Sequence, residues 1–204
     1  DKVEKFIHIS TDEVYGSLNA KETSFNLDTP YKPNSPYAAT KAASDLLVRS
    51  YFKTYKLPAI VTNCSNNFGP RQNAEKFIPT CIRKLKNKES IPVYGTGENV
   101  RDWIYVKDHV NCIWDVLERG DIGKQYLIGG NNELSNLDLI AHIKQCYEEI
   151  TDTKVDYKYI EFVEDRKGHD FRYSIDTFEY EQQFGKIKYY NFTDALKDTI
   201  VSYL

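Results

Sequence analysis

The stretch "VEKFIHISTDEVYG", residues 3–16, places an apolar run directly before a cluster of polar side chains. The run is rich in β-branched and aromatic residues, which predicts a buried strand over residues 3–10. Asp12 and Glu13 follow it side by side, although adjacent carboxylates repel each other and add little stability. At the carboxyl end of a parallel strand, where open α/β sheets bind ligands, such a pair indicates acid–base chemistry. The alternative is an exposed acidic turn or a cap on the next element.

Strand-like and helical patterns alternate along the rest of the chain. Residues 17–36 are polar, contain prolines and predict a loop long enough to be functional. A helix is predicted over 37–55, with Pro36 suited to its first turn. The other predicted elements are strands at 57–63, 91–94, 103–106, 126–128 and 155–160, helices at 77–85, 109–117, 136–150 and 192–204, and a turn at 65–72. This alternation is typical of an α/β fold with a parallel sheet.

The composition excludes several classes of protein. The chain has 204 residues, 41% of them hydrophobic and 28% charged, which is ordinary for a globular protein with a sizeable core. Its net charge of -3 gives no electrostatic footprint for nucleic acid or an anionic membrane, and no apolar run reaches the roughly 18 residues of a membrane span. The four cysteines are too far apart for a zinc site or redox motif, so we expect reduced thiols, no metal and a cytoplasmic location.

Tyr37 and Lys41 are four residues apart in the predicted helix, so they lie on one face of it. A nearby ammonium group favours the phenolate, which predicts a lowered pKa for Tyr37 and a base able to take a proton from a hydroxyl group. The competing interpretation is that Tyr37 and Lys41 are solvated and share this spacing by chance, because the chain contains 16 tyrosines.

Several stretches taken together carry a family resemblance. The strand ending "STDEVYG", the long loop, "SPYAATKAASD" and "IVTNCSNNFGP" resemble extended short-chain dehydrogenases/reductases that act on nucleotide sugars. More narrowly, the chain resembles the nucleoside-diphosphate-glucose 4,6-dehydratases through "GPRQNAEKFIP", "IPVYGTGENVRDWIYVKDH", "YLIGGNNELSN" and "VEDRKGHDFRYSID". The acidic pair is the most specific part of the resemblance. Epimerases of the superfamily typically carry Ser-Ser or Ser-Thr there, and related decarboxylases carry a single glutamate.

The resemblance implies a fold, a cofactor and a reaction. Residues 1–68 would be the carboxyl-terminal portion of a Rossmann-like, doubly wound, NAD-binding sheet that carries the catalytic residues. Residues 69–204 would be mainly a smaller α/β nucleotide-sugar-binding domain, with some segments returning to the first sheet. NAD would oxidise a nucleoside-diphosphate-glucose (dTDP- or UDP-glucose) at C4, water would leave across C5 and C6, and hydride would return to C6. A homodimer, formed through the helix that carries Tyr37, is also implied.

The family's catalytic roles fall on five residues of this chain. Tyr37 would act as the base at the C4 hydroxyl, and Lys41 would tune it and bind the nicotinamide ribose. Thr11 would hydrogen-bond near O4, Asp12 would protonate the departing C6 hydroxyl, and Glu13 would remove the C5 proton. Because C5 and C6 are neighbouring atoms, one short loop would have to reach both.

The family's binding contacts are spread over both parts of the chain. Cys64 and Asn66 are implied on the nicotinamide side, with simple packing as the alternative. Nucleotide-sugar contacts are implied at Asn66, Lys76, Arg101, Asn136, Arg166 and His169, with Pro92 and Tyr94 beside the base. A diphosphate needs cations and amide donors, and a tyrosine ring can stack on a pyrimidine.

Simpler interpretations compete with these roles. They are surface charge for Lys76 and Arg166, an ion pair of Arg101 with Asp102, a structural His169 and core packing of Tyr94. At the level of function, the competitors are a 4-epimerase or decarboxylase of the same superfamily and a non-catalytic nucleotide-sugar-binding protein. A binder has no need of all five catalytic residues, which argues against the last. Thymine or uracil as the base of the nucleotide is left open.

The glycine-rich turn that holds the NAD pyrophosphate in this family has no counterpart in the sequence. Gly95-Thr96-Gly97 lacks a third glycine and a following helix, and an acidic residue for the adenosine ribose is absent too. The chain also contains no methionine and opens at a strand pattern. We therefore expect a carboxyl-terminal piece of a longer dehydratase that binds NADH weakly and is inactive alone.

Overall fold

A parallel three-stranded sheet forms the first part of the computed structural model, which describes residues 3–204. Strand β2 (Ala59–Cys64) lies in its centre, between β1 (Phe6–Thr11) and β6 (Gln125–Ile128). All six residues of β2 are buried. A strand that is buried along its whole length is typical of a parallel sheet with helices on both faces.

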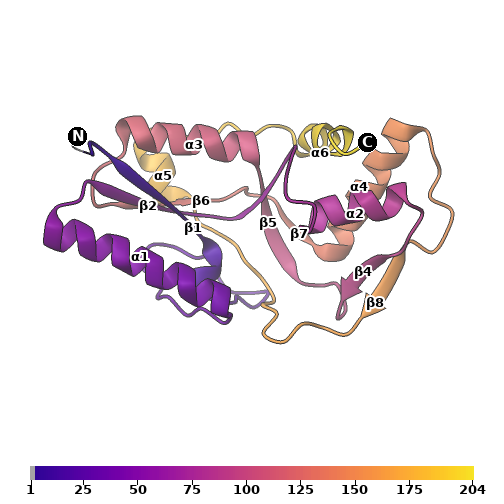
Figure 1. Cartoon of the computed structure of the whole chain (residues 1–204), viewed down its shortest axis with the longest axis horizontal. Coiled ribbons are helices and arrows are strands. Elements are labelled where there is room, and N and C mark those ends of the chain that lie inside the picture. The colour runs from indigo at the N-terminus through magenta and orange to yellow at the C-terminus, as the bar shows by residue number, and fades with distance from the viewer. Residues whose placement is uncertain (1–2) are drawn as a thin grey trace.

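Helices cover both faces of this sheet (Figure 1). Helix α1 (Pro36–Tyr55) packs on one face, where Ala42 joins a core cluster that includes Leu127 of β6. Helices α3 (Val106–Arg119) and α5 (Phe178–Phe184) pack on the other face. The predicted α/β fold with a parallel sheet is therefore confirmed.

Two smaller sheets form the rest of the framework. Strand β5 (Val100–Tyr105) lies between β3 (Asn66–Phe68), to which it is parallel, and β7 (Glu133–Ser135), to which it is antiparallel. Strands β4 (Ile91–Tyr94) and β8 (Ile160–Val163) form a parallel pair. Chain connectivity links these sheets to the first one, because β2 leads into β3 with one residue between them.

Three helices pack around these smaller sheets: α2 (Phe77–Lys86), α4 (Asn136–Thr151) and α6 (Phe192–Val201). They share the largest apolar cluster of the molecule with β4 and β5. Its fully buried members include Ile78, Ile82, Ile91, Leu139, Ile140, Ile143, Leu196 and Ile200. Burial of this cluster holds α2 and α4 in fixed positions relative to β4, and the amino-terminal ends of both helices border the cavity described below.

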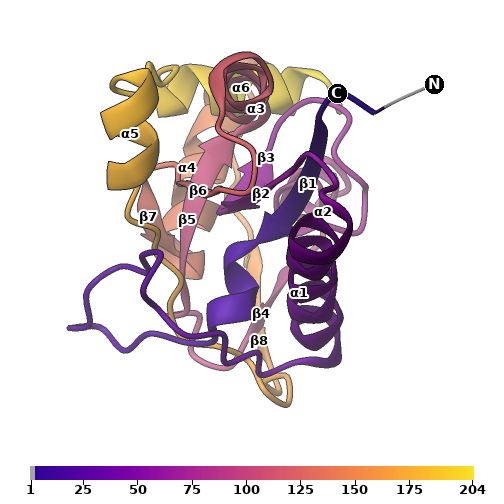
Figure 2. The same ribbon diagram turned by 90° about the vertical axis from the view of Figure 1, so that its left-hand side faces the viewer.

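The polar residues after β1 form a short 3-10 helix, η1 (Asp12–Tyr15), that lies against α1 (Figure 2). Gly16 ends η1 with a φ of 88°, and a side chain there would collide with the carbonyl oxygen of Lys32. Helix α1 begins with a side-chain cap, because the Ser35 hydroxyl accepts a hydrogen bond of 3.1 Å from the Ala38 amide and Pro36 occupies the first helical position.

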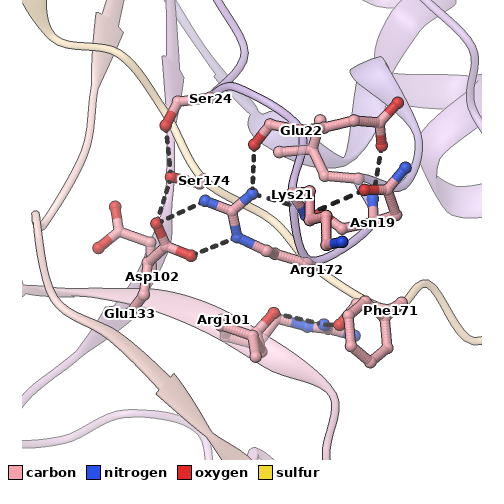
Figure 3. A network of polar contacts seen from close by, with 12 residues as sticks. Asn19, Lys21, Glu22, Ser24, Arg101, Asp102, Glu133, Phe171, Arg172 and Ser174 are labelled. Carbon is pink, nitrogen blue, oxygen red and sulfur yellow. Dashed lines mark hydrogen bonds and ion pairs between the residues drawn. The ribbon is translucent and has the colours of Figure 1, made fainter.

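The predicted long loop over 17–36 is present and is tied to the carboxyl-terminal half of the chain. Leu18 forms an isolated β-bridge with Arg172, and Phe25 forms one with Ile175. The Arg172 guanidinium donates two hydrogen bonds to the Glu133 carboxylate, at 2.5 and 2.8 Å (Figure 3). Its third nitrogen donates to the Glu22 carbonyl oxygen at 2.7 Å. A bidentate contact fixes both the distance and the orientation of the arginine relative to the carboxylate. Because Arg172 also binds the backbone of the loop, it holds the loop against β7.

Some predicted elements differ from the structure. The strand predicted at 155–160 is wrong, because β8 begins at Ile160, the first residue that pairs with β4, while Val155 packs into the apolar core. The turn predicted at 65–72 contains β3, and Val106 begins α3 instead of ending a strand. The three-residue strand β7 and the single turn η1 are too short to produce a periodic pattern, and α5 was also missed.

All four cysteines are buried and unpaired, consistent with the predicted reduced thiols. Within residues 3–204, none of the helices has the length and apolar character needed to cross a bilayer. Over the same residues, the structure contains no group of three or more metal-ligating side chains close enough to hold a metal ion.

Candidate active site

The cluster of polar residues after β1 sits at the carboxyl edge of the parallel sheet, as predicted. Thr11 is the last residue of β1 and pairs in register with Cys64, the last residue of β2. The Thr11 hydroxyl accepts a hydrogen bond from the Glu13 amide at 3.3 Å and donates one to a carboxylate oxygen of Asp12 at 3.2 Å. Thr11 therefore caps η1 and fixes the start of the turn that carries both carboxyl groups.

Asp12 is buried, with 1% of its surface exposed, so the alternative of an exposed acidic turn is wrong for this residue. Burial, followed by the charges of Glu13 and Asp102, raises the pKa of the Asp12 carboxyl to about 8. Its Oδ2 atom has no hydrogen-bond partner in the structure. At neutral pH the side chain is a protonated acid that is able to donate its proton.

Glu13 is half-buried and lines a cavity of about 640 Å³. Burial raises the pKa of its carboxyl group, and the positive charge of Arg101 opposes that rise. Glu13 and Asp12 therefore differ in environment although they are adjacent. The Asp12 carboxyl is enclosed in the protein, whereas the Glu13 carboxyl faces a cavity lined by cationic side chains. Such a difference in environment is how enzymes give two nearby carboxyl groups different pKa values, so that one acts as an acid and the other as a base.

Tyr37 lies in the first turn of α1 and also lines the cavity. The lowered pKa predicted from the spacing of Tyr37 and Lys41 is wrong for this structure. Burial, followed by the nearby acidic groups of Glu13, Cys64 and Asp12, raises the pKa of the Tyr37 phenol. The Lys41 ammonium donates to the backbone carbonyl oxygen of Ile9 at 2.8 Å, which directs it toward β1.

A cavity of about 640 Å³ opens beside η1, within the usual size range of ligand pockets. Residues from both parts of the chain line it, so the fold brings together side chains that are as far as 160 residues apart (from Glu13 to Tyr173). All eight residues predicted to contact a nucleotide sugar are among them: Asn66, Lys76, Pro92, Tyr94, Arg101, Asn136, Arg166 and His169. Thr11, Asp12, Lys41 and Cys64 are not among the lining residues.

Arg101 is a buried cation at the floor of the cavity. Its guanidinium donates to the backbone carbonyl oxygens of Val100 at 2.8 Å, Asp170 at 2.9 Å and Phe171 at 3.2 Å, and it stacks on the Tyr173 ring at 4.3 Å. The alternative of an ion pair with Asp102 is wrong. The Asp102 carboxylate instead accepts from the amides of Gly130 and Asn132, both at 2.7 Å.

A second cation is held at the rim. The Arg166 guanidinium lies 5.0 Å from the centre of the Tyr94 ring and 2.9 Å from Nε2 of His169. The other ring nitrogen of His169 contacts Asp165 at 2.7 Å, so His169 orients Arg166 as well as lining the cavity. Tyr94 is 38% exposed, which excludes the alternative of core packing.

Polar groups complete the lining between these cations. Lys76 precedes α2 and Asn136 begins α4, and the amino-terminal ends of helices favour anions. Asn66 begins β3, and its side-chain oxygen is buried without a partner. Cys64, two residues before Asn66, is also buried. Its burial raises the pKa of the thiol to about 12, so the thiol is uncharged.

Several lining residues were not predicted from the sequence. Tyr173 supports Arg101, and Trp103, Gln72, Asn67 and Asp170 also border the cavity. Tyr173 and Asp170 occur within the stretch "GHDFRYSID", close to His169, and this proximity was the only signal that could have pointed to them.

Comparisons with known proteins find relatives that match nearly the whole chain. The chain is 44% identical to a dTDP-glucose 4,6-dehydratase of Neisseria gonorrhoeae over 98% of its own length. It superposes with a TM-score of 0.87 and 42% identity on the crystal structure of dTDP-glucose 4,6-dehydratase from Bacillus anthracis in complex with NAD, covering 98% of this chain and 61% of that one. A UDP-glucuronic acid 4-epimerase of Bacillus cereus has the same fold, with a TM-score of 0.88, but only 25% identity over 62% of its length.

The chain spans about three fifths of the length of the curated relatives it matches, for example 59% of the Neisseria gonorrhoeae protein. Within that span, the family described as GDP-mannose 4,6 dehydratase matches residues 1–199. This match covers the acidic turn, the helix that carries Tyr37 and nearly all of the cavity-bearing half. The chain therefore belongs to the GDP-mannose 4,6 dehydratase family.

Proposed function

We propose that the full-length protein dehydrates a nucleoside-diphosphate-glucose, dTDP-glucose or UDP-glucose, to the 4-keto-6-deoxy sugar. The observation that carries this proposal is the pairing of a buried, protonated Asp12 with Glu13, which faces the cavity. An elimination across two neighbouring carbons needs a proton donor and a proton acceptor within reach of one short turn. An epimerase has no such need.

In the proposed reaction the two carboxyl groups act at adjacent carbons. Asp12 gives its proton to the departing C6 hydroxyl group, for which the raised pKa of its carboxyl suits it. Glu13 takes the proton from C5, and the opposing charge of Arg101 favours its ionised form. Thr11 holds η1 in place and is proposed to hydrogen-bond near O4.

The residues around Tyr37 fit the nicotinamide end of NAD. Asn66 presents a buried oxygen without a partner, suited to accept from the carboxamide, and Lys41 and Cys64 lie at the same edge of the sheet. The chemistry that bound NAD supplies there is reversible oxidation and reduction of the sugar. Tyr37 keeps its proton in this structure, so its role as base at the C4 hydroxyl requires added positive charge nearby, which the oxidised cofactor carries.

The nucleotide is proposed to occupy the other end of the cavity. Lys76, Arg166 and the amino-terminal end of α4 at Asn136 would bind the diphosphate, and Arg101 would bind nearer the sugar. Pro92 and Tyr94 of β4 would contact the base. The 44% identity to dTDP-glucose 4,6-dehydratases favours thymine over uracil.

Two wider proposals follow from the chain's surface and thiols. Helix α1 exposes a run of large apolar side chains (Leu46, Leu47, Tyr51 and Tyr55), which supports a homodimer formed through this helix. Four unpaired cysteines support a reducing, cytoplasmic location. A third proposal divides the chain into a cofactor-binding part, 1–68, and a mainly sugar-binding part, 69–204, from which β6 returns to the first sheet.

The test is incubation of the full-length protein and NAD with dTDP-glucose and, separately, with UDP-glucose, followed by mass spectrometry of the products. The expected product is lighter than its substrate by one water molecule. An epimerised hexose of unchanged mass would overturn the proposal, and binding without any turnover would favour a nucleotide-sugar-binding protein. Glu13→Gln is the matched variant, since it keeps the shape of the side chain and removes the base.

A further inference from the structure

A buried carboxylate that the proposed reaction does not use lies below the catalytic turn. Asp45 of α1 is 3% exposed. One of its oxygens lies 2.9 Å from Nε2 of His8, and the other accepts from the hydroxyl of Tyr31 at 2.9 Å and from the side-chain amide of Asn63 at 3.0 Å. Three groups from three segments of the chain therefore converge on one side chain of α1.

Asn63 carries this connection to the start of η1. It lies in β2 and is fully buried, and its side-chain amide also donates to the backbone carbonyl oxygen of Thr11 at 3.0 Å. Its side-chain oxygen accepts from Gln125 at 2.7 Å. The geometry of Asn63 is thus defined on both its donor and acceptor sides, which leaves it one orientation.

Gln125 carries the connection to the end of η1. Its side-chain amide lies 2.9 Å from the hydroxyl of Tyr15, the last residue of η1, and 3.0 Å from that of Tyr31. The residues His8, Tyr31, Asp45, Asn63 and Gln125, here called the Asp45 network, therefore hold the turn with Asp12 and Glu13 from both of its ends.

Asp45 lies on the same face of α1 as Tyr37 and Lys41, the two residues of this helix that take part in the proposed reaction. Tyr37, Lys41 and Asp45 recur every four residues, so they form one stripe along α1 that faces β1 and the cavity. Lys41 attaches this stripe to β1 through the Ile9 carbonyl oxygen. Asp45 attaches it to β2 and, through Asn63, to Thr11.

We infer that Asp45 is a positioning residue, which through Asn63 fixes the distance between the Tyr37 phenol on α1 and the acid–base turn of Asp12 and Glu13 on η1. This inference rests on the proposed function, because it assigns the purpose of that distance. A displacement of about 1 Å between reacting groups lowers a rate by about 100-fold. A side chain that ties the helix to the turn therefore matters for turnover even though it never touches the substrate.

Stability alone does not account for the network. Burying a carboxylate is costly, and apolar residues of similar volume usually stabilise a core equally well or better. A fully hydrogen-bonded buried network does, however, specify one arrangement of the segments that it joins. Ala42, one turn away on α1, already provides apolar packing on this face.

The test compares four variants of the full-length protein by kcat, KM and hydrogen exchange of the backbone amides of Glu13 and Gly16. Asp45→Ala removes the acceptor for Asn63 and Tyr31. Asp45→Asn keeps an oxygen for both and turns its amide toward His8. Tyr31→Phe removes one hydrogen bond to Asp45 and leaves the link through Asn63. Tyr126→Phe, at the next residue of β6 after Gln125, removes two partly buried hydrogen bonds on the other face of the sheet.

We expect Asp45→Ala to lower kcat about 100-fold, with KM changed less than about threefold, and to speed exchange at Glu13 and Gly16 about tenfold or more. Asp45→Asn should restore most of both, Tyr31→Phe should lower kcat less than Asp45→Ala because the link through Asn63 remains, and Tyr126→Phe should keep kcat. Equal losses of kcat in Asp45→Ala and Tyr126→Phe would overturn the inference, as would unchanged exchange at η1. If the wild type does not dehydrate either sugar, the proposed function fails, and the exchange measurement still decides whether Asp45 positions the turn.

Discussion

At the scale of single residues, the site is built around a carboxyl group in an unfavourable place. Asp12 is almost completely buried and has an oxygen without a partner, so the fold loses stability by keeping it there. Thr11 gives it one hydrogen bond, and Glu13 and Asp102 add negative charge nearby. Stability that is given up at one position in this way is common where chemistry needs an unusual group.

Asp12→Asn should therefore make the protein more stable and less active. The pKa of the Asp12 carboxyl is raised from 3.8 to about 8, so between these values the folded protein holds a proton that the unfolded chain has lost. Stability consequently falls as pH rises through this range, and the asparagine variant escapes that loss. We expect a higher Tm than that of the wild type, by about 2–4 °C per kcal/mol gained, with the difference largest above pH 8 and smallest near pH 4.

The same variant should lose activity by a factor of about 100 to 10,000, because it cannot donate a proton. The wild type should lose activity as pH rises above about 8, where Asp12 ionises. Thermal unfolding and kcat measured from pH 4 to pH 9 provide both tests. Asp156→Asn, on the exposed surface, is the control and should change neither quantity. A gain in Tm that is the same at every pH would contradict the explanation.

The sequence could predict which residues approach the cavity, but it could not predict how their neighbours tune them. The eight residues predicted to contact the sugar nucleotide all line one cavity. They could be predicted because each lies in a stretch of sequence that resembles the family. The pKa of Tyr37 was predicted in the wrong direction, since Glu13 and Cys64 are neighbours only in three dimensions. The role of Asp45 could not be predicted from the sequence either, since its hydrogen-bond partners come from β1, the long loop and β2.

His109 is a further example of a residue whose environment no pattern reveals. It lies in α3, where burial lowers the pKa of its imidazole to about 4. One ring nitrogen lies 2.9 Å from the side-chain oxygen of Asn67, which lines the cavity, and the other is buried without a partner. The ring is therefore uncharged near neutral pH, although the sequence indicated only an ordinary helical position.

At the scale of elements, α1 serves both the core and the site. Its range was predicted to within one residue, because its apolar spacing and Pro36 agree with one another. The boundaries of β8 and the existence of β7 were not predicted, because three- and four-residue strands are determined by their pairing partners and not by local pattern. Short strands were therefore predicted unevenly: β4 and β6 lie where the sequence placed them, whereas β7 and the start of β8 do not.

The cap of α1 provides a test of this double role. Ser35→Ala removes the acceptor for the Ala38 amide and should lower the free energy of unfolding by about 1 kcal/mol, which corresponds to about 2–4 °C in Tm. Because Tyr37 lies only two residues after the cap, fraying of this turn should also lower kcat severalfold. Thermal unfolding and steady-state kinetics of the full-length protein measure the two effects.

Asn191→Ala is the matched control. Asn191 caps α6 in the same way, accepting from the Asp194 amide at 3.1 Å, but α6 lies away from the cavity. Its loss should lower Tm by a similar amount and leave kcat unchanged. If both variants lose activity in proportion to their stability, the first turn of α1 has no special part in the site.

At the scale of the whole molecule, the cavity is formed by segments from both parts of the chain. Glu13 and Tyr37 come from the first part, and Arg101 and Arg166 come from the second. Arg172 ties the long loop to β7 and so joins the two parts beside the cavity. A ligand that contacts both parts should therefore stabilise the molecule as a unit.

Thymidine diphosphate should raise the Tm of the full-length protein. A ligand that binds only the folded state stabilises it by about 2.7 kcal/mol at 100 times its Kd, which corresponds to about 5–11 °C for a protein of this size. Arg166→Ala should reduce this shift by removing a cation from the rim of the cavity, because a guanidinium group is able to bind a phosphate through two hydrogen bonds. Thermal unfolding with increasing concentrations of the nucleotide provides the measurement.

Lys197→Ala is the control cation, since Lys197 pairs with Glu149 on α4 away from the cavity and should leave the shift intact. Uridine diphosphate tests the base, because a smaller shift with it than with thymidine diphosphate is expected if β4 favours thymine. An identical shift in wild type, Arg166→Ala and Lys197→Ala would mean that the diphosphate binds elsewhere. The proposed placement of the nucleotide between β4, α2 and α4 would then be wrong, whatever the reaction at the acidic turn.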